Sequence, residues 1–430
     1  MDAATKSEAG GLHSSLRYKF IALVGNENVR AATALDAVAG VQPKLVIEPG
    51  TGSELAEVLR LANEAGLAVI PRGGGTKLGW GNTPARADLI LSTARMTEII
   101  EHAWADLTLS VEAGCTIQRL QETLAQHGQR LALDALWPEK ATVGGVLSTN
   151  DSGALRLRFG ALRDLIIGAT IALPDGTLAS SGGKVVKNVA GYDLPKLVTG
   201  ALGTLGVITR AVFRLHPLPR NTRSFSVFAA NAEETQRFVL AVQDSRLAHT
   251  FLQSQFSDEA PPVSDILFEG TEAGLTAQES QLQSLAAPAN VMVASTPTWA
   301  AREELWNFVD PGTSAVAKVS LLPGDLARTM GGVEQAAKLH HLRWRALVYA
   351  TGLGWVRLEG KPAALKGALQ LLRVEMETHG GSLVALHRPE RMAEFEAWGN
   401  PGDALPLMKA LKQRVDPKNT LNLGRFVGGI

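Results

Sequence analysis

The sequence has a single cysteine, Cys115, and no long apolar run. One cysteine excludes an internal disulfide and any metal or iron-sulfur site that needs several thiolates, which suits a reducing compartment. No stretch reaches the roughly 18 consecutive apolar residues of a membrane-spanning helix. The N-terminus also lacks the basic-then-apolar order of a secretory signal. We therefore expect a cytoplasmic protein without a transmembrane segment.

The sequence also has no net charge at neutral pH. The 430 residues include 42 basic and 42 acidic side chains, so no overall field favours binding to nucleic acid or to an anionic membrane. A chain of this length is too long for one ordinary hydrophobic core, which predicts two domains or three.

Glycine, by contrast, is abundant and gathers in two places. The first is IPRGGGTKLGWG, over residues 70–81. A Walker loop would place lysine directly after the glycines, where Thr76 stands, and a Rossmann turn would place its third glycine at Leu78. Neither motif fits, so this glycine-rich backbone indicates an anion-binding loop of another kind.

The second glycine-rich stretch is ATVGGVLSTNDSGALRLRFGALRDLIIGA, over residues 141–169. Small residues let peptide N–H groups approach a ligand closely, and hydroxyl and amide side chains add neutral donors. For either stretch alone, ordinary tight turns are an equally good interpretation. Together the two stretches favour a site that binds one elongated, anionic cofactor.

The order of the predicted elements indicates an α/β domain followed by an α+β domain. Residues 43–75 are typical of a strand, a helix with Ser53 as its N-cap, a second strand and a glycine loop. Residues 164–183 predict a hairpin that turns at residues 174–176. We divide the chain into an N-terminal segment (1–38), a cofactor domain (39–218), a cap (219–405) and a C-terminal segment (406–430) that returns to the cofactor domain.

Four motifs in this order resemble the FAD-binding flavoproteins of the vanillyl-alcohol-oxidase or PCMH type. They are PRGGGTKLGWG, the second glycine-rich stretch with its continuation to PDG, GGKVVKNVAGYDLPKLVTGALGTLGVIT, and DPKNTLNLGRF near the C-terminus. Within this family the chain resembles in particular the FAD-binding E subunits of bacterial glycolate oxidases. The resemblance implies an α+β fold, in which a PCMH-type FAD-binding domain of two α/β subdomains carries an α+β cap.

The resemblance also implies where FAD is bound. The first glycine loop matches the family segment that wraps the pyrophosphate, and the second matches the segment along the pyrophosphate, the ribityl chain and the flavin face. Lys187 lies in a family motif, where a cation would stabilise the reduced flavin ring, although a solvated lysine is the alternative. Ile208 matches a strand whose backbone meets the cofactor, and the family's tail reaches the flavin. The cofactor-binding residues implied in this way are Arg72, Gly73, Gly74, Gly75, Thr76, Lys77, Leu78, Thr142, Val143, Gly144, Gly145, Ser148, Asn150, Ser152, Gly153, Lys187, Ile208, Asn422 and Arg425.

The residues at two positions indicate that the flavin is not covalently bound. Relatives with a covalent flavin carry a histidine directly after the first glycine loop, where this chain has Thr76. Cys115 follows a predicted strand and is typical of a small buried hydrophobe rather than of a flavin tether. We therefore expect non-covalent FAD.

No residue pattern in the cap identifies a catalytic base. Related hydroxy-acid dehydrogenases carry a His-containing Gly-Asp-Gly-Asn stretch that binds a divalent metal, and TGLGWVRLEG (351–360) stands in its place, so we expect no metal. Oxidation of a hydroxy acid needs a base for the hydroxyl proton and a cation for the carboxylate. Arg343, Arg345, Arg357, His387 and Arg388 are candidates, but ordinary surface charge explains each of them as well.

These inferences predict an FAD-binding subunit of a glycolate oxidase-like complex. It would take part in the two-electron oxidation of a 2-hydroxy acid such as glycolate, beside a partner flavoprotein, and pass electrons to an iron-sulfur subunit. Contact with the inner membrane would come through those partner subunits. The alternatives are a self-sufficient FAD-dependent dehydrogenase of hydroxy acids or alcohols, and a flavin-free structural subunit that retains the fold.

Overall fold

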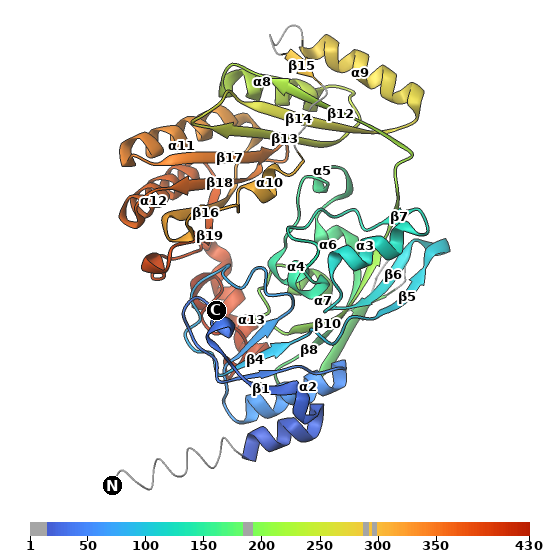
Figure 1. Ribbon diagram of the computed structural model, residues 1–430, viewed down its shortest axis with the longest axis vertical. Helices are drawn as coiled ribbons and strands as arrows, with labels where there is room; N and C mark the ends of the chain where they lie inside the picture. The colour runs from blue at the N-terminus through green and yellow to red at the C-terminus, as the bar shows by residue number, and fades with distance from the viewer. Residues whose placement is uncertain (1–14, 184–191, 287–291, 295–298) are drawn as a thin grey trace.

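The computed structural model describes residues 15–183, 192–286, 292–294 and 299–430. An N-terminal domain with two main sheets lies below a cap built on one large sheet, and helix α13 (Leu405–Val415) runs from the cap side back toward the N-terminal domain (Figure 1). Short 3-10 turns punctuate the chain at Asn26–Asn28, Ala34–Asp36, Trp104–Asp106, Pro311–Thr313, Pro323–Asp325, Glu390–Met392, Gly402–Ala404 and Val427–Gly429.

The first sheet of the N-terminal domain has the strand order β1-β2-β4-β3, with β2, β4 and β3 parallel and β1 antiparallel. Helix α2 (Gly52–Glu64) connects β2 to β3 and buries Leu55 and Leu59 in the core beneath the sheet. Its N-cap is Thr51, whose hydroxyl accepts the Glu54 N–H, and not Ser53 as predicted, because the helix already begins at Gly52. The strands are β1 (Val29–Ala31), β2 (Leu45–Ile47), β3 (Val69–Arg72) and β4 (Leu89–Ser92).

The described residues before 39 are part of this first subdomain. A helix covers residues 15–24 and buries Phe20 in the same core as α2. Strand β1 pairs with β2. The predicted division at residue 38 therefore cuts through a sheet, because the pairing partner of β1 lies after it.

The second sheet of the N-terminal domain is antiparallel, with the strand order β5-β6-β10-β8-β9. The predicted hairpin is confirmed, since β8 and β9 pair across the turn after Ala172. The strands are β5 (Ile99–Ala103), β6 (Thr108–Glu112), β8 (Ile166–Ala172), β9 (Leu178–Gly182) and β10 (Val207–Arg214), and β7 (Gln129–Arg130) pairs separately with β11 (His216–Pro217). The helices are α3 (Ile117–Ala125), α4 (Val143–Thr149), α5 (Arg156–Phe159), α6 (Leu162–Leu165) and α7 (Leu194–Val198).

The cap is an eight-stranded sheet with the order β15-β12-β14-β13-β17-β18-β16-β19, in which every neighbouring pair is antiparallel. The strands are β12 (Asn221–Phe228), β13 (His249–Ser257), β14 (Val263–Gly270), β15 (Met292–Ala294), β16 (Ser314–Ser320), β17 (Arg343–Tyr349), β18 (Leu353–Glu359) and β19 (Ser382–His387). The helices are α8 (Ala232–Asp244), α9 (Glu272–Ala286), α10 (Ala301–Glu304), α11 (Leu326–His340) and α12 (Pro362–Thr378).

The two faces of the cap sheet have different partners because side chains alternate along each strand. On one face, residues such as Ala317 and Val356 pack with Val333 of α11 and Leu369 of α12. On the opposite face, which we call the inner face, Tyr349 and Trp355 pack with Trp80 and Leu136 of the N-terminal domain. The inner face is thus the boundary between the two parts of the molecule.

The C-terminal tail returns to the N-terminal domain, as predicted. Leu421 forms a parallel bridge with Val69, beside the first glycine loop. Asp416 holds the turn before it, because its carboxylate accepts the backbone N–H groups of Thr420 (2.9 Å) and Leu421 (2.8 Å). The buried Lys412 ammonium binds the same carboxylate at 2.6 Å. This polar cluster fixes the path of the tail toward the loop.

Candidate functional site

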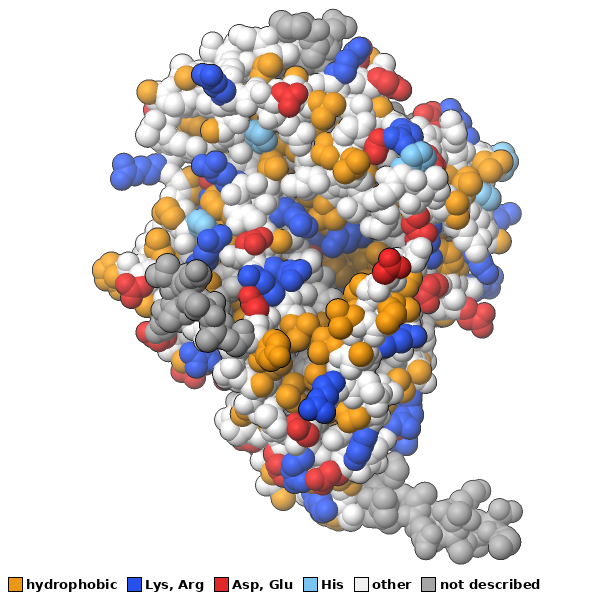
Figure 2. Space-filling model, turned by 180° about the vertical axis from the view of Figure 1, so that it is seen from behind, with side chains coloured by type: hydrophobic (Ala, Val, Ile, Leu, Met, Phe, Trp, Pro, Cys, Tyr) orange, Lys and Arg blue, Asp and Glu red, His pale blue; other side chains and the backbone are white. Residues whose placement is uncertain are grey.

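A cavity of about 710 Å³, open to solvent, lies where the two glycine-rich stretches meet. We call it the glycine-lined cavity. The first loop follows β3, the second stretch forms α4, residues 202–208 lead into β10, and the C-terminal tail closes one side. The molecule is also hollowed between the cap and the N-terminal domain on the face in Figure 2, with basic and hydrophobic side chains around the hollow.

The structure brings most of the predicted cofactor residues to this cavity. Those that line it are Arg72, Gly73, Gly74, Gly75, Thr76, Lys77, Leu78, Thr142, Gly144, Gly145, Ser148, Ile208, Asn422 and Arg425. Val143 does not line it, because its side chain packs into the core of the second subdomain. Asn150, Ser152 and Gly153 lie beyond the end of α4, away from the cavity lining. Lys187 lies outside the described residues.

The first glycine loop has the free donors that an anion needs. No acceptor for the backbone N–H groups of residues 73–77 is found among the described residues. A side chain at Gly73 would overlap the Thr142 hydroxyl, and one at Gly74 would overlap the Lys140 carbonyl oxygen. Successive unpaired N–H groups form an anion-binding concavity. This loop therefore fits the pyrophosphate of a dinucleotide such as FAD, and the glycines are required by the close approach of the second stretch.

Two tail residues complete the cavity. Asn422 adopts a left-handed backbone (φ 47°), and its side-chain amide donates to the Leu202 carbonyl. The buried Arg425 guanidinium donates to the carbonyl oxygens of Leu78 and, at 2.6 Å, of Trp80, and its Nε has no partner among the described residues. Burial lowers the pKa of Arg425 to about 10, so it still carries its charge at neutral pH. The tail thus holds the end of the first loop and adds a cation to the cavity wall.

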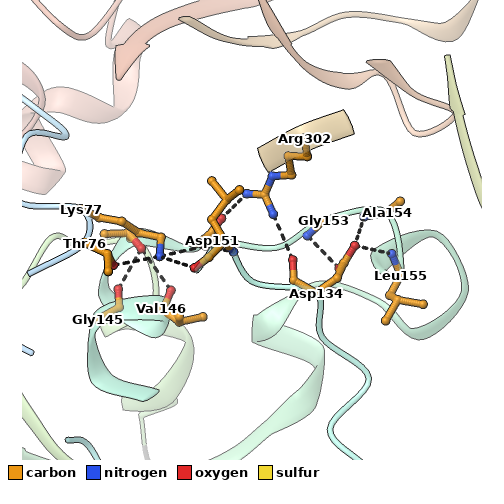
Figure 3. A network of polar contacts seen from close by, with 12 residues as sticks. Thr76, Lys77, Asp134, Gly145, Val146, Asp151, Gly153, Ala154, Leu155 and Arg302 are labelled. Atoms are coloured by element: carbon orange, nitrogen blue, oxygen red, sulfur yellow. Dashed lines mark hydrogen bonds and ion pairs between the residues drawn. The ribbon is translucent and has the colours of Figure 1, made fainter. Parts of the chain in front are cut away.

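A buried ion network connects the first loop to the cap (Figure 3). Lys77 pairs with Asp151 at 3.1 Å, and Arg302, from α10 of the cap, pairs with the other carboxylate oxygen. The Asp151 side chain is 0% exposed. Burial disfavours its charge, but Arg302 and Lys77 outweigh burial and hold the pKa of Asp151 below its usual value. Three charges from three segments therefore meet in a buried site.

A second buried carboxylate, Asp134, lies beside this network (Figure 3). It accepts the N–H groups of Gly153 (3.0 Å) and Ala154 (2.7 Å), and Arg302 donates to its backbone carbonyl at 3.0 Å. Burial raises the pKa of Asp134 to about 6. The predicted cofactor residue Gly153 therefore faces this carboxylate, and a side chain there would overlap it.

The cap candidates for catalysis are dispersed. Arg343 and Arg345 are exposed and pair with Glu259, which follows the end of β13. Arg357 is buried, donates to the Asn307 carbonyl at 2.9 Å and pairs with Glu359. His387 contacts the Pro311 carbonyl at 3.1 Å, whereas Arg388 donates to the Gly81 carbonyl at 2.8 Å and so ties the cap to the first loop. None of the five lines the glycine-lined cavity.

The stretch that stands in place of the relatives' metal-binding motif is part of the cap sheet. Residues 351–360, which stand in place of the metal-binding stretch, form part of the turn between β17 and β18 and all of β18. Among the described residues, no group of three or more His, Cys, Asp or Glu side chains could hold a metal ion. No helix in this described part of the chain is both long and apolar enough to cross a membrane.

We predict that denaturation releases all bound flavin. Thr76 lines the cavity and offers only a hydroxyl, and Cys115 is buried in the core of the second subdomain. Neither side chain can tether flavin, because the Thr76 hydroxyl is a poor nucleophile and the Cys115 thiol is buried away from the cavity. Acid precipitation should therefore leave a colourless pellet and a yellow supernatant. Flavin fluorescence that remains with the polypeptide on a denaturing gel would contradict this expectation.

Comparison with known families and structures gives a consistent result. Residues 43–182 match the family described as FAD binding domain. The solved structure of p-cresol methylhydroxylase with substrate bound aligns with a TM-score of 0.78 at 17% identity, over 96% of both chains. The fold is therefore the PCMH-type FAD-binding fold with mixed α/β architecture, as predicted.

Curated relatives are similar over different lengths. A D-lactate dehydrogenase of Archaeoglobus fulgidus is 29% identical over 422 residues, which span 89% of this chain and 91% of the relative. Glycolate oxidase subunit GlcD of Bacillus subtilis is 32% identical over 197 residues, 46% of this chain and 42% of the relative. A mitochondrial D-2-hydroxyglutarate dehydrogenase of Bos taurus is 36% identical over 41% of this chain and 32% of the relative.

Proposed function

Because this chain is an FAD-dependent oxidoreductase with an FAD-binding domain over residues 43–182, we propose that it takes part in the oxidation of a 2-hydroxy acid. We propose further that it acts as the FAD-binding subunit of a glycolate oxidase-like complex. Glycolate or a similar acid is the substrate, and a partner flavoprotein and an iron-sulfur subunit complete the complex.

The substrate class is supported by one observation. The relatives that match this chain over its length or over its flavin domain are named for D-lactate, glycolate and D-2-hydroxyglutarate, all of which are 2-hydroxy acids. A flavin-free structural subunit is not favoured, because the glycine-lined cavity keeps its free N–H donors.

The residues of this chain have distinct tasks in the proposal. The N–H groups of residues 73–77 bind the pyrophosphate, and Thr142 and Ser148 line the path beside it. Bound FAD supplies a two-electron acceptor. The inner face of the cap packs Trp355 and Tyr349 against Trp80, which lies at the end of the first glycine loop. A single cysteine cannot hold an iron-sulfur cluster, so electrons leave through a partner.

A self-sufficient dehydrogenase is the second candidate. It is favoured by the similarity to the D-lactate dehydrogenase, which extends over 91% of that protein and so includes the cap. The absence of a metal-binding cluster among the described residues favours dependence on a partner, because nothing in that part of the chain replaces it.

We predict that the isolated chain, saturated with FAD, reduces an artificial dye only weakly with glycolate or D-lactate. Addition of divalent metal should not raise the rate, and co-expressed partner subunits should. Turnover of several per second, close to the common enzyme value of about 10 per second, would instead establish the self-sufficient dehydrogenase.

A further inference from the structure

A segment of the cap binds the far end of the first glycine loop. It consists of residues 388–398, which follow β19, and we call it the strap. The Asn82 side-chain amide donates to the Glu396 carboxylate at 2.8 Å, and the Asn82 side-chain oxygen accepts the Ala397 N–H at 2.8 Å. The two adjoining contacts run from the Arg388 guanidinium to the Gly81 carbonyl oxygen (2.8 Å) and from the Thr83 hydroxyl to the Ala393 carbonyl oxygen (3.3 Å). Three consecutive residues of the loop therefore bind the strap.

The strap is fixed to the body of the cap. Phe395 is buried in the core that the cap sheet forms with α11 and α12. The Ala397 carbonyl oxygen accepts the N–H of Ala385 in β19 at 2.8 Å and the guanidinium of Arg373 in α12 at 3.0 Å. That guanidinium also lies 4.8 Å from the centre of the Phe395 ring. The position of the strap, and with it the position of Asn82, is therefore set by the cap.

The C-terminal tail meets the strap at the same end of the loop. The Arg425 carbonyl oxygen accepts the backbone N–H of Asn82 at 2.9 Å and the indole N–H of Trp398, in the strap, at 3.0 Å. Gly81 adopts a left-handed backbone (φ 84°), and a side chain there would overlap this carbonyl oxygen. The cap, the first glycine loop and the tail thus share one polar junction.

This junction fixes one end of the loop, and the sheet fixes the other. The loop begins at β3, which pairs with β4. The N–H groups of residues 73–77, which have no acceptor among the described residues, lie between the two fixed ends. A loop that is already ordered loses less conformational entropy when it binds a ligand, so it binds more tightly. Thermodynamic linkage then requires that the ligand stabilise the junction by the same factor.

We infer that Asn82 and Arg388 are positioning residues for FAD. Neither residue lines the glycine-lined cavity. They act through the loop, because their contacts with the strap and with Gly81 hold the backbone that presents its N–H groups to the pyrophosphate. Bound FAD in turn fixes the strap, and so the cap, on the N-terminal domain. The inference concerns the cofactor alone and does not depend on the substrate or on partner subunits.

The test titrates the full-length apoprotein with FAD and measures the Kd from flavin fluorescence. Asn82→Asp sets a carboxylate against Glu396 and should raise that Kd roughly fivefold or more, the lower end of ordinary coupling between two sites. Glu396→Gln alone should have little effect, because the new amide oxygen still accepts the Asn82 amide. The two changes together should restore the affinity, because the new amide then donates to the new carboxylate. Arg388→Met should weaken binding severalfold, whereas Arg328→Met, the same change at an exposed position on α11, should not.

Hydrogen exchange measures the reverse effect. FAD should slow amide exchange in residues 388–398 of the wild type, and it should do so much less in Asn82→Asp. A merely structural role of Asn82 predicts a lower Tm of the apoprotein with an unchanged Kd for FAD, and that result overturns the inference. So does a double variant that binds FAD no better than Asn82→Asp, or exchange in the strap that FAD does not change. If Asn82→Asp fails to fold, the Kd of Arg388→Met and the exchange of the wild type decide.

Discussion

Gly74→Asp should abolish FAD binding in a chain that still folds. A side chain at this position would overlap the Lys140 carbonyl oxygen and displace the second glycine-rich stretch from the first loop. The carboxylate would also oppose the pyrophosphate, and two unit charges at about 4 Å repel by roughly 4 kcal/mol at an effective dielectric of 20. A cofactor with micromolar affinity is held by only about 8 kcal/mol, so affinity should fall by roughly a thousandfold. Flavin absorbance of the purified protein and titration of the apoprotein measure the loss.

Two controls separate the causes of that loss. Gly79→Asp adds the same charge in the same segment, but a side chain there meets nothing within 4 Å, so FAD should still bind. Gly74→Ala keeps the steric overlap without the charge and should have an intermediate effect. Full FAD occupancy in folded Gly74→Asp would mean that the loop does not hold the cofactor.

The glycine-lined cavity could be predicted from the sequence because the residues that form it stand in short local motifs. Consecutive glycines and small residues indicate a backbone that a ligand or another segment approaches closely. The structure brings 14 of the 19 predicted residues to one cavity. The exceptions have local reasons too. Val143 shares the buried face of α4 with Val146 and Leu147 and so faces the core, and Asn150 ends that helix in a left-handed conformation (φ 49°). A glycine-rich pattern marks a segment, not the direction in which each side chain points.

The buried ion network could not be predicted in this way. Asp151 in TNDSG is typical of a polar loop residue, and its partner Arg302 is 151 residues away in the cap. The proximity of these residues depends on how the cap packs on the N-terminal domain, which no local pattern encodes. The one available signal was an acidic residue within the second glycine-rich stretch.

The largest loss of stability should come from Asp151→Ala. This change leaves Lys77 and Arg302, both buried, without the carboxylate they share. Removal of one partner of a buried ion pair costs about 3–5 kcal/mol, because the remaining charge is left uncompensated. Urea unfolding followed by tryptophan fluorescence should show this loss. Glu334→Ala, which removes an exposed pair with Lys338 on α11, should change stability by less than about 1 kcal/mol.

The pH dependence of this effect has a defined sign. The pKa of Asp151 is lower in the folded protein than in the unfolded chain, where it is about 3.9. The stability that its charge provides is therefore complete above that value and is lost as the pH falls through the folded pKa. The difference between the wild type and Asp151→Asn should stay constant from neutral pH down to about 5 and shrink only below about 4.

A combined variant distinguishes the charge of Asp151 from its shape. Lys77→Met, Asp151→Leu and Arg302→Met together replace the network with apolar side chains, and such replacements are often neutral or stabilising. The triple variant should therefore recover most of the stability that Asp151→Ala loses. If the triple variant is as unstable as Asp151→Ala, packing rather than charge holds the cap to the first glycine loop at this point.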